Sequence, residues 1–304
     1  MVDIAILDGG LGQEIQKRSN SQAHPLWSVK VMFDKPDIVV KVHNDFIVSG
    51  ARVICLNTYA ATRTRMTRNG FGEKLEEAHK TAIKLAKQSK NLYSSKERPI
   101  QIAGCLPPLV ASYVAEVSMD YNNSLNEYQE LVSLQKNDVD LFLIETISNI
   151  DEARAGISAV KEVNKPVFIS LTLKDDLSNE LRSGESLNFA IDVLSNEFPD
   201  GIMLNCSSPE AILNAMPIMT KLEIPFGGYA NGFKSIDKLT PGSTVDKLSA
   251  RKNLSPEVYT DFAFQWINDG ATILGGCCEI GPRHIEYLCQ KLKSKGHTLT
   301  TLPV

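Results

Sequence analysis

Three of the six cysteines stand at the ends of two apolar runs, where they could share one metal ion. Cys206 ends the run 201–206, and Cys277 and Cys278 follow the run 271–276. If both runs are parallel strands of one closed sheet, their carboxyl ends meet at the same rim. Zinc is tetrahedral, binds thiolate sulfur well and keeps one position open when it is catalytic. We therefore predict that Cys206, Cys277 and Cys278 bind zinc.

The other three cysteines fit a simpler interpretation. A free cysteine is usually a small buried hydrophobe, and six cysteines in 304 residues are far too few for a disulfide scaffold. Cys55, Cys105 and Cys289 are accordingly predicted to be buried thiols, the last of them inside an outer helix.

Two carboxylates also end predicted strands. Glu145 ends the apolar run 140–145, where it could pair with a substrate ammonium, although a salt bridge to a neighbouring loop is the alternative. Asp8 ends the run 3–8, and the glycines that follow, beginning with Gly9, expose backbone N–H groups that could hold a carboxylate.

Glycine pairs near the carboxyl end of the chain allow a different chemistry. The pairs at 227–228 and 275–276 fit the phosphate site common in barrels. Against this, Glu279 puts an acid where a phosphate needs N–H donors. An arginine cluster could guide an anion but is more typical of a solvated loop; it comprises Arg63, Arg65 and Arg68.

Short apolar runs alternate with amphipathic helical patterns along the whole chain. The predicted strands are 3–8, 52–58, 100–104, 140–145, 167–173, 201–206, 224–229 and 271–276. The predicted helices are 36–49, 73–90, 124–137, 149–162, 186–197, 209–220, 255–268 and 282–294. This alternation predicts an α/β fold, a single-domain (β/α)8 TIM-type barrel over 1–304, with a doubly wound sheet as the alternative. Two long connections, 9–35 and 230–254, are either binding loops or plain surface excursions.

Composition argues against several classes of partner. With 32 Lys and Arg against 36 Asp and Glu, the net charge is −4, which provides no basic field for nucleic acid or anionic lipid. The sequence contains no apolar run near the roughly 20 residues that span a bilayer. The first residues show no signal-peptide pattern, so a cytoplasmic location is expected. The sequence makes no prediction about oligomeric state.

Together these motifs resemble the homocysteine S-methyltransferase family, which includes betaine-dependent enzymes. The resemblance covers essentially the whole chain. It rests on Leu-Asp-Gly-Gly-Leu-Gly at 7–12, Leu-Trp-Ser at 26–28, Asn-Thr-Tyr at 57–59, Ile-Glu-Thr at 144–146, Leu-Asn-Cys at 204–206, Gly-Gly-Cys-Cys at 275–278, Pro282, His284 and Ile285.

The resemblance implies a (β/α)8 barrel in which the three rim cysteines are zinc ligands. It implies that Asp8, Gly9 and Glu145 hold the amino-acid part of homocysteine. By the same resemblance Trp27 and Tyr59 lie near the methyl donor. Asn231 belongs to the segment of the strand-7 motif.

The implied activity is zinc-dependent methylation of the homocysteine thiol to give methionine. The expected donor is S-methylmethionine or S-adenosylmethionine, with glycine betaine as the alternative. A phosphate-binding barrel enzyme and a non-catalytic zinc-binding protein are the rival classes. The chain departs from the family pattern at Ala230, at Glu279 and in the loop 104–108 around Cys105, positions that bear on the second substrate.

Overall fold

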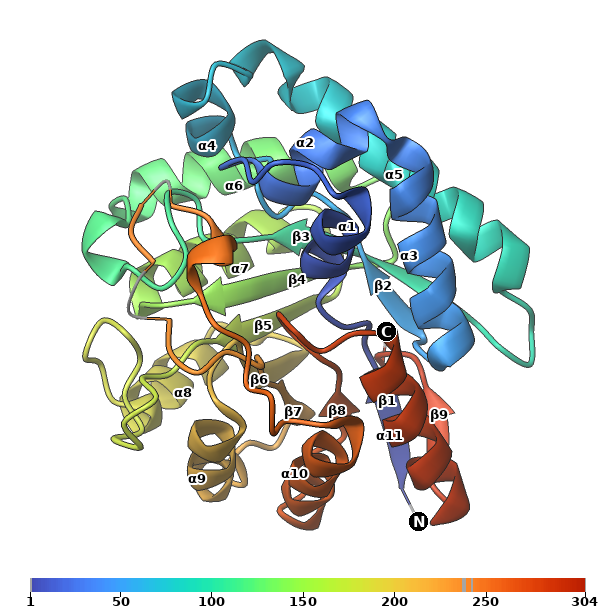
Figure 1. Ribbon diagram of the computed structural model, residues 1–304. Helices are drawn as coiled ribbons and strands as arrows, with labels where there is room; N and C mark the ends of the chain where they lie inside the picture. The colour runs from blue at the N-terminus through green and yellow to red at the C-terminus, as the bar shows by residue number, and fades with distance from the viewer. Residues whose placement is uncertain (1, 237–238, 242, 304) are drawn as a thin grey trace.

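Eight parallel strands alternate with helices and curl around a common core (Figure 1). The computed structural model describes residues 2–236, 239–241 and 243–303. The strands are β1 (Asp3–Ile6), β2 (Val53–Cys55), β3 (Gln101–Leu106), β4 (Leu141–Ile147), β5 (Val167–Leu171), β6 (Gly201–Asn205), β7 (Phe226–Tyr229) and β8 (Ile273–Leu274). Each lies inside or close to a predicted run, because strands covered on both faces are continuously apolar.

The sheet order runs from β2 through β8 and then to β1. Two backbone hydrogen bonds join the ends of this order, since Arg52 N donates to Ile6 O (2.8 Å) and Asp8 N donates to Val53 O (3.0 Å). All strand pairs are parallel, including the Leu7–Val53 bridge at the closure. The barrel prediction is confirmed, and the carboxyl ends of all eight strands therefore face one rim.

The eight predicted helices are also present. They are α3 (Pro36–Ser49), α5 (Leu75–Tyr93), α6 (Tyr121–Gln135), α7 (Ile150–Lys161), α8 (Leu187–Ser195), α9 (Pro209–Met219), α10 (Pro256–Asn268) and α11 (Pro282–Ser294). Local capping explains several boundaries: the Asn149 side chain accepts from Glu152 N, and the Ser255 side chain accepts from Val258 N.

The long connections carry more structure than predicted. The prediction of a long loop over 9–35 is wrong, because this segment folds into α1 (Leu11–Ser19) and α2 (Trp27–Asp34). Its apolar residues Ile15 and Met32 are fully buried, and their burial stabilises helices whose short patterns are weak in isolation. The segment 230–254 holds one bridge, between Phe233 and Ala250, and a 3-10 turn; residues 237, 238 and 242 of it lie outside the described residues.

A ninth strand, β9 (Thr298–Thr300), was not predicted. It pairs with β1 in parallel, with Asp3 opposite Thr298. The Gln101 side chain fixes Leu302, two residues after β9. Its amide nitrogen donates to Leu302 O and its carbonyl accepts from Leu302 N, both at 3.0 Å. The C-terminal segment thus lies against the base of the barrel beside β1 (Figure 1).

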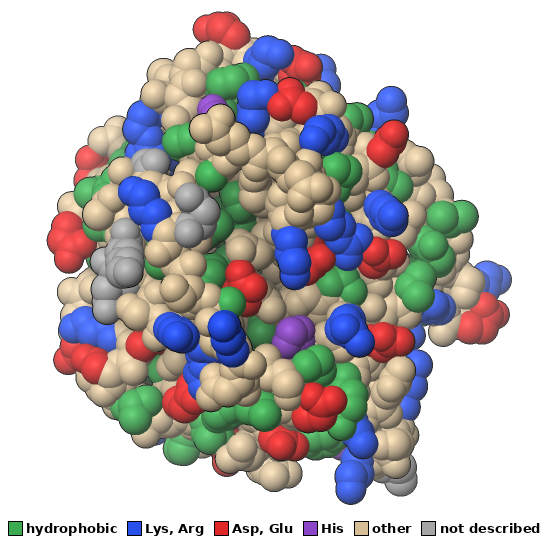
Figure 2. All heavy atoms as spheres, viewed as in Figure 1, with side chains coloured by type: hydrophobic (Ala, Val, Ile, Leu, Met, Phe, Trp, Pro, Cys, Tyr) green, Lys and Arg blue, Asp and Glu red, His purple; other side chains and the backbone are tan. Residues whose placement is uncertain are grey.

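The surface is mixed in charge. Figure 2 shows acidic and basic side chains interspersed over the face that it presents. Among the described residues, no helix is both long enough and apolar enough to cross a membrane.

Candidate metal and substrate site

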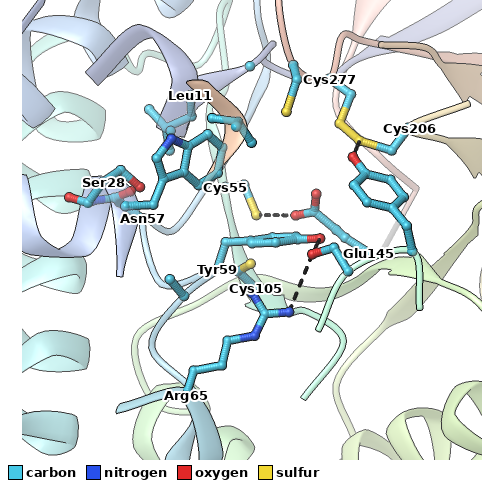
Figure 3. A pocket seen from close by; sticks show the side chains of 18 of the residues that line it. Leu11, Ser28, Cys55, Asn57, Tyr59, Arg65, Cys105, Glu145, Cys206 and Cys277 are labelled. Carbon is cyan, nitrogen blue, oxygen red and sulfur yellow. Dashed lines mark hydrogen bonds between the residues drawn. A yellow bond between two sulfur atoms is a disulfide. The ribbon is translucent and has the colours of Figure 1, made fainter. Parts of the chain in front are cut away.

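The three rim cysteines come together as predicted. The Sγ atoms of Cys206, Cys277 and Cys278 all lie within 4.8 Å of one another. In this structure Cys206 and Cys277 are joined by a disulfide, with their Cα atoms 5.7 Å apart, and Cys278 is a free thiol (Figure 3). We predicted metal-binding thiols at these positions, and the spacing of the cysteines along the sequence did not indicate a disulfide.

Cys206 is held in an unusual backbone conformation just after β6. Its φ is +48°, in the left-handed region that non-glycine residues rarely adopt. Its carbonyl accepts from Asn231 Nδ2 (2.8 Å) and Thr172 Oγ1 (3.3 Å), and its N–H donates to Tyr229 O (3.2 Å). These three contacts fix the strained residue and aim its sulfur across the rim.

Asn231 is therefore a supporting residue in this structure. Its side chain is 2 % exposed and contacts the backbone of Cys206 and Phe233. It is not among the described residues that line the cavity. Its predicted role in binding substrate stays a prediction, while its contacts indicate that it positions Cys206.

The cysteine pair after β8 is anchored to the turn after β7. Cys277 N donates to Ala230 O (3.0 Å), and Cys278 O accepts from Gly232 N (2.8 Å). A Cβ on Gly276 would lie 2.3 Å from a side-chain atom of Ile280, so only glycine allows this tight turn. Burial raises the pKa of the Cys278 thiol to about 12.

Glu145 lies in β4 beside an irregularity of the strand. The register between β4 and β5 shifts between Ile144 and Ile147, and Thr146 has a φ of +62°. Regular alternation along β4 already places Glu145 on the same face as Leu143, two residues earlier, which also lines the cavity. Glu145 consequently points into the cavity, where Cys55 Sγ donates to its Oε1 at 2.9 Å (Figure 3).

Asn205 connects Thr146 and Cys206, two residues with left-handed backbones. Its Oδ1 accepts from Thr146 N at 3.0 Å and its Nδ2 donates to Thr146 Oγ1 at 2.9 Å, and it immediately precedes Cys206. The motif Leu-Asn-Cys contains this residue, but the pattern gave no signal that its amide reaches past β5 to brace β4.

Asp8 lies on the same side of the cavity as Glu145. Its Oδ2 accepts from Cys55 N at 3.0 Å. Burial raises the pKa of Asp8 well above its usual value, and the nearby Glu145 carboxylate raises it further. Burial also raises the pKa of Glu145, although the thiols of Cys55 and Cys105 act in the opposite direction. In the described part of the chain neither carboxylate has a basic ion-pair partner, so this part of the cavity suits a cation.

Aromatic side chains form a second wall of the cavity. Trp27 and Tyr59 meet edge to face with ring centroids 6.3 Å apart, and the Tyr59 hydroxyl shares a 2.9 Å hydrogen bond with Ser112. Opposite the rim cysteines, the Arg65 guanidinium lies 5.4 Å from the Tyr59 ring centroid. Tyr113 completes this wall and donates from its hydroxyl to Cys206 Sγ at 3.1 Å.

The arginine cluster divides in the structure. Arg65 is 8 % exposed and lines the cavity, which differs from the solvated loop expected for it, because α4 (Arg63–Arg68) turns its side chain inward. Arg63 instead bonds the Glu130 carboxylate at the surface. Arg68 also lines the cavity and donates to Val110 O at 3.3 Å.

The structure corrects the expected loop around Cys105 and explains two of the glycines in the sequence motifs. Cys105 belongs to β3 and faces the cavity rather than lying in a loop, which corrects the expected segment 104–108. Close strand packing explains a glycine of the alternative phosphate motif, because a Cβ on Gly227 would lie 1.8 Å from Ile273 O. The loop after β1 is equally tight, since a Cβ on Gly9 would lie 2.2 Å from Ile280 O.

The fold and the site together define a class of protein, a (β/α)8 barrel with a cysteine cluster at the carboxyl ends of its strands. The homocysteine S-methyltransferase family model matches residues 5–292, so the chain belongs to that family and is a methyltransferase.

Individual relatives share the whole length of the chain. A selenocysteine methyltransferase of Astragalus bisulcatus is 26% identical and covers 97% of this chain and 94% of its own. The homocysteine S-methyltransferase of Escherichia coli K12 is 27% identical and covers 94% of each chain. The metallated form of the E. coli homocysteine methyltransferase MmuM has the same fold, with a TM-score of 0.80 and 22% identity over 95% of this chain and 96% of that one.

Proposed function

We propose that this protein transfers a methyl group to the thiol of L-homocysteine, with zinc held by Cys206, Cys277 and Cys278. One observation carries the proposal: three cysteine sulfurs converge at one place in a cavity that also presents the Asp8 and Glu145 carboxylates, which have no ion-pair partner among the described residues. An amino acid with a terminal thiol matches this arrangement of a metal at one end and anionic groups at the other. Full-length relatives bearing the name homocysteine S-methyltransferase support it.

The donor set fits zinc when the disulfide is reduced. Three thiolates leave a fourth tetrahedral position for a substrate sulfur. Zinc bound there would act as a Lewis acid that favours the thiolate form of the substrate. A reducing compartment such as the cytoplasm would keep Cys206 and Cys277 available as ligands.

The residues around the cavity then align the two substrates. Glu145 and Asp8 bind the homocysteine ammonium, which offsets the cost of their own burial. Trp27 and Tyr59 face a cationic donor, whose charge their ring faces stabilise. The reaction forms a bond between the homocysteine sulfur and the methyl carbon while the donor bond to that carbon breaks, and the thiol proton passes to solvent. Alignment of the two reacting atoms supplies much of the rate.

We infer that the donor is a sulfonium, S-methylmethionine or S-adenosylmethionine, and that glycine betaine is the alternative. A sulfonium leaves as a neutral thioether and a quaternary ammonium as a neutral amine, so the aromatic wall suits a cation that loses its charge on transfer in either case. Since a relative is named selenocysteine methyltransferase, selenocysteine belongs in the test as a second acceptor.

The test is a panel of the three donors with homocysteine or selenocysteine, using reduced protein loaded with one equivalent of zinc and detecting methylated product by mass. We expect methionine with at least one sulfonium donor and about one zinc per chain held by the rim cysteines. Serine at any one of the three rim cysteines should abolish the activity and lower zinc content sharply. Cys289→Ser is the matched control, because Cys289 is a buried thiol on α11 away from the cavity.

Three outcomes would contradict the proposal. Zinc loss from Cys289→Ser equal to that from the rim variants would remove the ligand assignment. Stoichiometric zinc without methyl transfer from any donor would favour a non-catalytic zinc-binding protein. Tight binding of a sugar phosphate by zinc-free protein would favour the phosphate-binding class.

A further inference from the structure

Two buried thiols in the same cavity have no part in the proposed methyl transfer. Cys55 ends β2 and Cys105 lies in β3, and both line the cavity with exposures of 8 % and 1 %. A buried cysteine that only fills space needs no polar neighbour. These two thiols instead meet the carboxylate of Glu145, which comes from the third strand in succession.

The sheet register explains why the three side chains converge. Cys55 is opposite Ala103, two residues before Cys105, and Cys105 is opposite Leu143, two residues before Glu145. Residues two apart on a strand share a face. Cys55, Cys105 and Glu145 therefore all face the barrel interior. Cys105 lies two residues beyond the residue opposite Cys55, and Glu145 lies two residues beyond the residue opposite Cys105.

The resulting geometry is that of a metal-ligand set. One oxygen of Glu145 and the two Sγ atoms lie within 4.8 Å of one another, and the Cys55 sulfur is 2.9 Å from that carboxylate. Ligand atoms around a tetrahedral zinc, at 2.0–2.3 Å from the ion, are separated by about 3.3–3.8 Å. Figure 3 shows Cys55, Cys105 and Glu145 grouped together, apart from the Cys206–Cys277 disulfide.

Charge in this part of the cavity also favours a cation. The Asp8 carboxylate lies against the Cys55 backbone, with its Oδ2 3.0 Å from Cys55 N. No basic side chain in the described part of the chain forms an ion pair with Asp8 or Glu145. Two thiols and a carboxylate select a borderline-soft divalent cation such as Zn²⁺ or Cd²⁺ rather than Mg²⁺ or Ca²⁺.

We propose a second metal site, formed by Cys55, Cys105 and Glu145, that takes a thiophilic divalent cation independently of the rim cysteines. Binding exchanges the two thiol protons for the metal and leaves the carboxylate as the third ligand. Because Glu145 is also the proposed ammonium partner, an occupied second site excludes the acceptor amino acid; that consequence alone rests on the proposed function.

The experiment measures Cd²⁺ binding to the full-length protein, reduced with a non-chelating phosphine. Equilibrium dialysis gives cadmium per chain, and the ultraviolet charge-transfer band of cadmium thiolates reports sulfur ligation. Four proteins are compared: the wild type, the rim variant Cys206→Ser/Cys277→Ser/Cys278→Ser, the inner variant Cys55→Ser/Cys105→Ser, and the control Cys289→Ser. Circular dichroism establishes that each one is folded.

We expect about two cadmium ions per chain in the wild type and the control, and about one in the rim and inner variants. The cadmium retained by the rim variant should show the thiolate band and should bind at least about 10-fold more weakly once Glu145→Gln is added. A rim variant that binds no cadmium, or an inner variant that still binds two, overturns the proposal. If the inner variant does not fold, the rim variant alone decides. None of these readouts depends on methyl transfer, so failure here is separate from failure of the proposed function.

Discussion

Glu145 is a partly buried acid, and water stabilises its charge less than it would at the surface. Burial raises its pKa, and it accepts a hydrogen bond from the Cys55 thiol rather than from a basic side chain. A carboxylate in this situation gains more from an incoming ammonium than one at the surface does, because the attraction is screened less. Substrate binding would then supply the missing counter-charge.

Replacing Glu145 with Gln keeps the shape of the side chain and removes its charge. A charge-assisted contact contributes roughly 1.5–3 kcal/mol, so we expect homocysteine to bind about 10- to 150-fold more weakly. Zinc held by the rim cysteines should stay the same, because Glu145 is not one of the proposed rim ligands. Calorimetric titration of protein loaded with one equivalent of zinc, with metal assayed on the same samples, measures both.

Glu286→Gln is the control for that prediction, since Glu286 is exposed on α11. Unchanged homocysteine affinity in the Glu145 variant would remove it from the substrate site. Parallel loss of rim zinc would make it a structural support of the metal centre instead.

At the scale of elements, β4 and the residue that follows β6 carry two of the departures from regular geometry near the site. Thr146 and Cys206 both have left-handed backbones, with φ of +62° and +48°. Such residues cost about 1–3 kcal/mol each and persist only where their surroundings hold them. Asn205 is part of those surroundings, because its buried amide bonds both the backbone and the hydroxyl of Thr146.

Asn205→Ala should therefore disturb both stability and the site. Loss of two buried hydrogen bonds should lower the free energy of unfolding by about 1–3 kcal/mol. It should also lower kcat/KM, because Thr146, the residue next to Glu145, loses its brace. Urea denaturation and steady-state kinetics measure the two effects. Asn196→Ala, at the exposed end of α8, should change stability by less than about 0.5 kcal/mol; equal effects of the two variants would contradict the role given to Asn205.

These elements also show which structural features can be predicted from the sequence. The strands were predictable because parallel strands covered by helices are continuously apolar, and the rim position of Cys206 followed from its place at a strand end. The bulge at Thr146 was not predictable, since neither Glu145 nor Thr146 favours a left-handed backbone. The inward turn of Arg65 and the clustering of Cys55 with Cys105 depend on tertiary register, which no local pattern encodes.

At the scale of the whole molecule, buried histidines link stability to pH. His43 on α3 is fully buried, and neither ring nitrogen has a hydrogen-bond partner among the described residues. Burial lowers the pKa of His43 to about 4, whereas an unfolded histidine titrates near 6.5. The unfolded chain therefore takes up this proton first as the pH falls. The stability linked to His43 is present above about pH 6.5 and is lost progressively toward pH 4.

We expect His43 to account for about 2 kcal/mol of the stability lost between pH 7 and pH 4.5. His43→Leu should unfold at a similar urea concentration at pH 7 and should lose correspondingly less stability at pH 4.5. His79, also buried with a lowered pKa, keeps its own contribution in this variant. Identical pH dependence in wild type and variant would show that His43 does not carry this effect.

The pairing of β1 has a consequence for how the protein is made. β1 leaves the ribosome well before two of its neighbours, β8 and β9, with Asp3 opposite Thr298 and Ala5 opposite Ile273. Until those strands are made, β2 is the strand partner available to β1, through the Leu7–Val53 bridge and the backbone hydrogen bonds beside it. An apolar strand with open edges is prone to pair with other chains. The nascent chain therefore exposes the edge of β1 until β8 and β9 emerge.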